Sequence, residues 1–151
     1  MLLHISPLGF HRYAGEFLRA AKDFPTNETF SPVPYYLICR SIELALKAFL
    51  LARGVSKREL KLRSLGHDLE KVLEKAVSMG LDEIVSISFQ HNEELKKANS
   101  YYLSKGFEYF EVISAVTGYR NLPNLTVLSE FATLLGTNLK QVCMQATETP
   151  V

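Results

Sequence analysis

Hydrophobic residues recur every three or four positions along most of the chain, which is the spacing of a buried face on an α-helix. The first such stretch follows Ser6 and Pro7, a capping residue and a proline suited to a first helical turn. Its apolar positions are Phe10, Tyr13, Ala14, Phe17, Leu18 and Ala21. Pro25 then interrupts the pattern, so we expect the first helix to end there and a short polar loop to follow.

The longest helical signal runs from 31 to 54 and reads SPVPYYLICRSIELALKAFLLARG. Ser31 is expected to cap this helix, Pro32 to occupy its first position, and Gly54 to end it in a left-handed conformation. One apolar face consists of Ile38, Ile42, Ala45, Leu46, Phe49 and Leu50, and further apolar residues widen it. Because helices that are apolar on most sides lie inside a bundle, this one is expected to be central.

Three weaker helical patterns follow. Gly66-His67-Asp68 leads into a helix that Asp68 is expected to cap, with His67 as the alternative start, and that ends at Gly80. Its buried face consists of Leu69, Val72, Leu73, Ala76 and Val77. A short helix capped by Ser88 or Asn92 should end near Tyr101, whereas 81–89 is ambiguous because it is rich in β-branched residues. The stretch 105–123 reads as an aromatic-rich connector, and Asn124 is expected to cap the last helix.

These elements predict an all-α fold, an antiparallel up-and-down bundle of four to five helices with a long aromatic-rich connector before the last one. A chain of 151 residues with 47% hydrophobic content fits one domain, 1–151, with a core of about 6–145. No stretch reaches the length of a membrane span and no secretory signal precedes the first helix, so we expect a cytoplasmic protein without a membrane partner. Cys39 and Cys143 are expected to be buried, reduced thiols.

A charged row interrupts the apolar surface of the central helix. Arg40, Glu43 and Lys47 are spaced by three and four positions and therefore share one side of the helix. One interpretation is a set of ion pairs that holds the bundle together. The other is a ligand site, since charges in a partly dry place must be paired or used. The sequence leaves these two interpretations equally open.

Other candidate residues have a structural interpretation that we favour over a functional one. The segment 53–63 carries five basic residues, ending at Arg63, which could contact phosphates but is also typical of a solvated loop. His67 is a candidate general base, although a single histidine at a helix start is more often structural. Arg120 and Asn121 precede the last helix, where turn chemistry explains them. The aromatic rings between 101 and 119 could stack bases, but sealing the core is the simpler role.

The common metal-binding, phosphate-binding and nucleophile-elbow motifs are missing from the sequence. The four histidines and two cysteines lack metal-binding spacing, and no Walker A, GxGxxG or GxSxG motif occurs. We therefore expect no metal site and no cofactor.

The run RSIELALKAFLLARG, the basic segment after it and then GHDLEKVLEKA together resemble the HEPN family, the higher eukaryote and prokaryote nucleotide-binding domains. The specific part of the resemblance covers 35–76. It implies an antiparallel bundle of four or five helices, often a homodimer. Such domains bind nucleotides or RNA, accompany a nucleotidyltransferase partner in toxin–antitoxin pairs, or cleave RNA without a metal. The residues matching the family's polar positions are Arg40, Glu43, Lys47 and His67.

The sequence departs from the ribonuclease members of that family. Those members carry an arginine followed after four to six residues by a histidine near the last helix, but no histidine follows Arg120. We therefore expect a non-catalytic nucleotide- or RNA-binding domain, with Arg40 and Lys47 supplying positive charge. One alternative is a structural dimerisation or protein-interaction module. A further alternative is a metal-independent ribonuclease with an atypical site at His67 or Arg120.

Overall fold

A computed structural model describes residues 6–25, 30–62, 65–107 and 121–148, and within them the chain is an all-α helical bundle without strands. The long helices are α1 (Pro7–Asp23), α2 (Val33–Ala52), α4 (Leu69–Ser78), α5 (Phe89–Leu103) and α7 (Leu125–Glu148). A one-turn helix α3 (Lys57–Leu60) and a 3-10 turn η1 (Leu81–Glu83) lie in the connections. The predicted fold class is therefore confirmed. Most of the aromatic connector lies outside the described residues.

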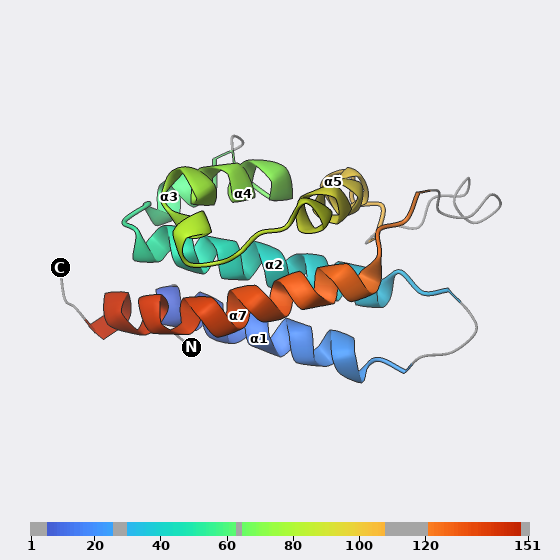
Figure 1. Cartoon of the computed structure of the whole chain (residues 1–151), viewed down its shortest axis with the longest axis horizontal. Coiled ribbons are helices and arrows are strands. Elements are labelled where there is room, and N and C mark those ends of the chain that lie inside the picture. The colour runs from blue at the N-terminus through green and yellow to red at the C-terminus, as the bar shows by residue number, and fades with distance from the viewer. Residues whose placement is uncertain (1–5, 26–29, 63–64, 108–120, 149–151) are drawn as a thin grey trace.

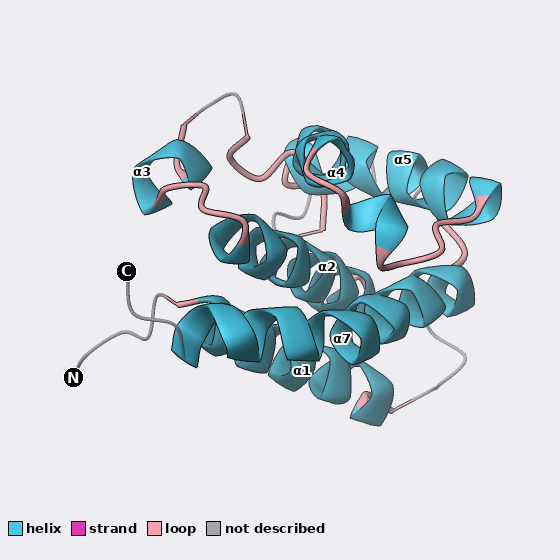
Figure 2. Ribbon diagram, turned by 60° about the vertical axis from the view of Figure 1, so that its left-hand side comes forward, coloured by secondary structure: helices cyan, strands magenta, loops and turns pink. Residues whose placement is uncertain are grey.

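Helix α2 lies between two layers of helices (Figures 1 and 2). Helices α1 and α7 pack side by side against one face, and α1 runs antiparallel to α2. Helices α4 and α5 cover the opposite face. The predicted central position of this helix is correct, and the position explains its composition, because a helix covered on two faces has little surface left for water.

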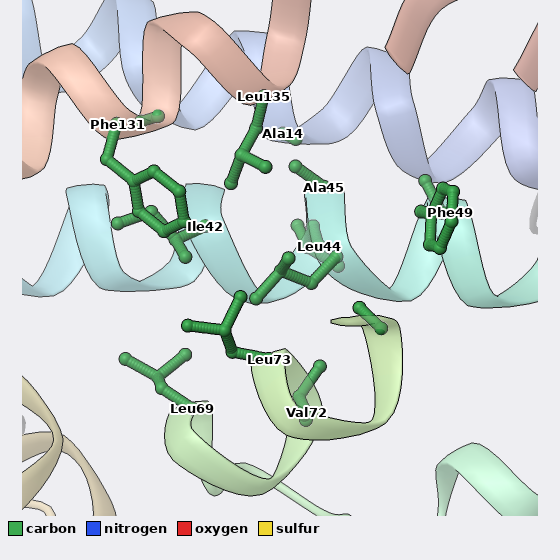
Figure 3. Packing of buried hydrophobic residues seen from close by; sticks show 14 of the residues in the cluster. Ala14, Ile42, Leu44, Ala45, Phe49, Leu69, Val72, Leu73, Phe131 and Leu135 are labelled. Carbon is green, nitrogen blue, oxygen red and sulfur yellow. The ribbon is translucent and has the colours of Figure 1, made fainter. Parts of the chain in front are cut away.

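The core follows this layering (Figure 3). Ala45 and Ile42 of α2 point toward α7, where both Leu135 and Phe131 lie. Leu44 points the other way, toward Leu73 of α4. All six residues of the predicted α2 face are buried. Val77 was predicted to be buried as well, but it is 37% exposed because it lies at the edge of the α4 face, beyond Ala76.

Capping residues determine where most of the helices begin, and glycines follow two of them. The hydroxyls of Ser6, Ser56 and Ser88 and the carboxylate of Asp68 each accept a first-turn backbone N–H, as capping residues do. Asn124 does the same for α7 through Val127. Gly54 and Gly80 follow helices with φ of +92° and +97°, the left-handed conformation that glycine adopts without strain.

The structure corrects the predicted start of α2 and the segment predicted to be a loop after it. Helix α2 begins at Val33, one residue later than expected, and Pro32 takes the cap position without a side-chain bond. Ser31 still accepts the N–H of Val33 at 3.2 Å, so the expected hydroxyl contact is present. The segment between Gly54 and Gly66 was predicted to be a loop, but it contains α3, which Ser56 caps and the buried Leu60 anchors.

Candidate functional site

The charged row of α2 converges on one carboxylate. The side chain of Glu43 is only 1% exposed, and its Oε2 accepts hydrogen bonds from Nη1 of Arg40 and from Nζ of Lys47, both at 3.0 Å. This geometry follows from the sequence spacing, because residues three and four positions apart on a helix are neighbours. Glu43 is thus the centre of the row.

Two further donors reach Glu43 from other elements. The Tyr102 hydroxyl of α5 donates to Oε1 at 2.6 Å, and Nδ1 of His67 lies 2.9 Å from Oε1 and 3.1 Å from Oε2. Since an ionised carboxylate can only accept, Nδ1 of His67 must carry the hydrogen. The rings of His67 and Tyr102 also lie perpendicular to each other, with an interplanar angle of 90° and centroids 6.4 Å apart.

Lys47 joins the cluster to the chain that leads into α4. Its Nζ donates to the carbonyl oxygen of Gly66 at 2.6 Å in addition to Glu43, and its side chain is 9% exposed. Two of the three ammonium N–H groups are therefore bound inside the protein. The residue after Gly66 is His67, so Lys47 helps to place the imidazole beside Glu43.

The surroundings keep Glu43 ionised. Burial alone would raise its pKa, but Lys47, the Tyr102 hydroxyl, Arg40 and the His67 hydrogen bond outweigh burial, and the pKa of the carboxyl lies below its ordinary value. Burial raises the pKa of Tyr102, and the negative charge of Glu43 raises it further, so the phenol remains a donor. The cluster therefore holds one negative and two positive charges, without counting His67.

Only part of this cluster reaches solvent. The side chain of His67 is 62% exposed and that of Arg40 is 29% exposed, whereas Glu43 and Lys47 are buried. A ligand arriving from solvent would meet the guanidinium and the imidazole. Glu43, behind them, fixes the position of both.

A second polar cluster holds the start of α4. Asn99 of α5 is 2% exposed, and its Oδ1 accepts the N–H of Leu69 at 2.8 Å. Its amide nitrogen donates to Asp68 at 3.0 Å and to Glu70 at 3.1 Å. These bonds satisfy backbone and side-chain groups at a helix N-terminus, so the role of Asn99 is structural.

The remaining predicted site residues are separate from this cluster or outside the described residues. Arg63 and Arg120 are outside, and Asn121 is exposed with φ of +53° in the turn before α7. In the basic segment Arg53, Lys57, Arg58 and Lys61 are exposed. Glu59 of α3 lies 3.9 Å from Lys75 of α4, a loose surface pair.

Tyr102 is the site residue that the sequence did not indicate. It lies 59 positions from Glu43, among aromatic residues that were expected to seal the core.

Within the described ranges, every buried side-chain nitrogen and oxygen has a hydrogen-bond partner, and no three His, Cys, Asp or Glu side chains are placed to hold a metal ion. Cys39 and Cys143 are buried free thiols. In the described part of the chain, no helix has the length and hydrophobicity that crossing a membrane requires.

Comparison of the chain with family models, with curated proteins and with solved structures finds no match.

Proposed function

We propose that this chain is a HEPN-like domain that binds RNA or a nucleotide through a phosphate group, with Arg40 as the main contact and His67 beside it. The observation that supports this proposal most is the convergence of Arg40, Lys47, Tyr102 and His67 on the buried carboxylate of Glu43. The bundle around it agrees with the fold that the sequence resemblance implies.

The chemistry of Arg40 suits a phosphate. A guanidinium has five N–H donors in a planar fork, and its bond to Glu43 uses only part of them. Because Glu43 restrains the side chain in advance, less conformational entropy is lost when a ligand binds. Lys47 pairs with the same carboxylate as Arg40, so the cluster contains two cationic side chains for one glutamate.

The basic segment provides a second reason to favour a polyanion. Arg53, Lys57, Arg58 and Lys61 are exposed in the chain that follows α2 and leads toward His67. Cations of this kind add affinity for a nucleic-acid backbone without reading its sequence. The resemblance further suggests a second copy of the chain and a nucleotidyltransferase as protein partners.

Fluorescence anisotropy with a labelled single-stranded RNA, repeated with unlabelled ATP as competitor, tests this function. Arg40→Ala should weaken binding roughly tenfold to a hundredfold, the value of one or two charge-assisted hydrogen bonds. Arg12→Ala is the matched control, because Arg12 also pairs with a glutamate on its own helix and is exposed.

Light scattering of the same variants tests the alternative of an interaction module. If Arg40→Ala dissociates a dimer and leaves RNA and ATP affinity unchanged, the site holds a protein partner and the nucleotide proposal is wrong.

A further inference from the structure

The imidazole of His67 is fixed at one nitrogen and open at the other. Nδ1 is bonded to Glu43 at 2.9 Å, so in the neutral ring the hydrogen is on Nδ1 and the lone pair is on Nε2. The side chain is 62% exposed, while the carboxylate that holds it is 1% exposed. A buried acceptor therefore selects the tautomer of an exposed ring.

The other histidines of the described chain are arranged differently. Nε2 of His11 lies 2.7 Å from the carbonyl oxygen of Gly136, a neutral acceptor. His91 is 8% exposed, stacks on Phe131, and its Nδ1 accepts the N–H of Ser88 at 3.1 Å. Neither ring is bonded to a carboxylate, and His91 is not open to a reagent.

A carboxylate behind an imidazole makes the opposite nitrogen a better nucleophile. The negative charge of Glu43 offsets the positive charge that the ring gains when Nε2 forms a new bond. Arg40 is bonded to the same Oε2 of Glu43 that lies 3.1 Å from Nδ1 of His67, so the guanidinium and the imidazole are neighbours. The ring that carries the nucleophilic Nε2 thus shares its carboxylate partner with an anion-binding group.

We propose that His67 is a phosphoryl-accepting residue, whose Nε2 takes a phosphoryl group from an N-phosphoryl donor of the phosphoramidate type while Arg40 binds the phosphoryl oxygens. The proposal rests on the phosphate site at Arg40 described above, and it adds a covalent modification to that site.

With phosphoramidate itself as the donor, the transfer forms one bond to phosphorus and breaks another. The Nε2 lone pair attacks phosphorus, the Nε2–P bond forms, and the P–N bond of the donor breaks. The nitrogen of the donor already carries three hydrogens in its zwitterionic form, so it leaves as neutral ammonia. The hydrogen on Nδ1 stays in its bond to Glu43.

Phosphorylation by phosphoramidate at neutral pH, followed by ³¹P NMR and mass spectrometry of peptides, tests the proposal. We expect His67 to be phosphorylated at Nε2 at least about tenfold faster in the folded protein than in the same chain unfolded in urea, where Glu43 and Arg40 are no longer beside it. Labelling of folded His67 that is no faster than in urea, or labelling at Nδ1, overturns the proposal.

Two variants separate this inference from the proposed function. Arg40→Ala should slow the labelling of His67 roughly tenfold, and labelling at the wild-type rate would overturn the shared site. His67→Gln should remove phosphorylation of the peptide that contains position 67, together with the ³¹P signal assigned to it. If RNA binding depends on Arg40 but His67 is not labelled, only the phosphoryl acceptor is wrong. If RNA binding is the same in Arg40→Ala and wild type, the proposed function is wrong whatever the labelling shows.

The tautomer can be measured without any substitution. The ¹⁵N chemical shifts of His67 should show Nδ1 protonated and Nε2 unprotonated in the neutral ring. The opposite assignment would overturn the proposal.

Discussion

The hydroxyl of Tyr102 lies 2.6 Å from Oε1 of Glu43, although the two residues are 59 positions apart in the sequence. This contact joins α5 to the central helix α2 and provides the fourth donor to a buried carboxylate. Because Glu43 also binds residues of α2 and of the segment before α4, one side chain connects three parts of the bundle.

Tyr102→Phe should destabilise the fold by about 1–3 kcal/mol, because Glu43 loses a donor that water does not readily replace in a buried position. Urea unfolding followed by circular dichroism measures this change. Tyr13→Phe on α1 is the control, since the contact of that ring with Arg12 does not need the hydroxyl. Equal midpoints for both variants would show that the Tyr102 bond adds nothing to stability.

Lys47→Met should cost more, about 3–5 kcal/mol, because it removes one member of a buried ion pair and leaves the Gly66 carbonyl without its donor. The matched control is Lys22→Met. Lys22 is exposed and bonds Thr133 at 3.1 Å, so its loss should change stability by less than about 0.5 kcal/mol. Similar unfolding midpoints for the two variants would contradict the buried role of Lys47.

The stability of the protein should depend on pH through Glu43. Its pKa in the folded state lies below the ordinary value of 4.5, so the unfolded chain binds a proton more readily than the folded one. The contribution is therefore complete above about pH 5 and is lost as the pH falls through the lower folded-state pKa.

Glu43→Gln should be less stable than wild type at pH 7 and should lose less stability on acidification. Unfolding free energies between pH 7 and pH 3 measure both effects. Glu16→Gln, which changes an exposed glutamate, should keep the wild-type pH dependence. A parallel pH dependence of Glu43→Gln and wild type would mean that Glu43 is not the titrating group.

Asn99→Ala should destabilise the protein by about 1–3 kcal/mol, because the N–H of Leu69 would be left buried without an acceptor. Asn92→Ala on the same helix is the control. Asn92 is exposed and its amide only reaches the carbonyl of Ser88 at 3.2 Å. Hydrogen exchange at the start of α4 should rise in Asn99→Ala and not in Asn92→Ala, whereas equal protection would contradict the capping role of Asn99.

Features of the fold that depend on neighbours in sequence could be predicted. The caps at Ser6 and Asp68 and the left-handed glycines at 54 and 80 are local signals, and the apolar spacing of α2 indicated its central position. The boundary of α2 was missed by one residue, because a serine and two prolines offer competing start positions.

The site was predictable only where it follows helix geometry. The spacing of Arg40, Glu43 and Lys47 placed them on one side of α2, but it did not show whether that side faces solvent, a cleft or other helices. The burial of Lys47 and the contact of Tyr102 depend on how α4 and α5 pack against α2. Such contacts between distant residues leave no periodic signal in a single sequence.

The salt dependence of RNA binding tests the proposed phosphate contact of Arg40 most directly. Wild type and Arg40→Ala would be titrated with the same single-stranded RNA between 50 and 200 mM salt, using anisotropy. If Arg40 neutralises a phosphate, Arg40→Ala should reduce the slope of log K against log salt by about 0.7, and Arg12→Ala should not. An unchanged slope and affinity in Arg40→Ala would contradict a phosphate site at the Glu43 cluster.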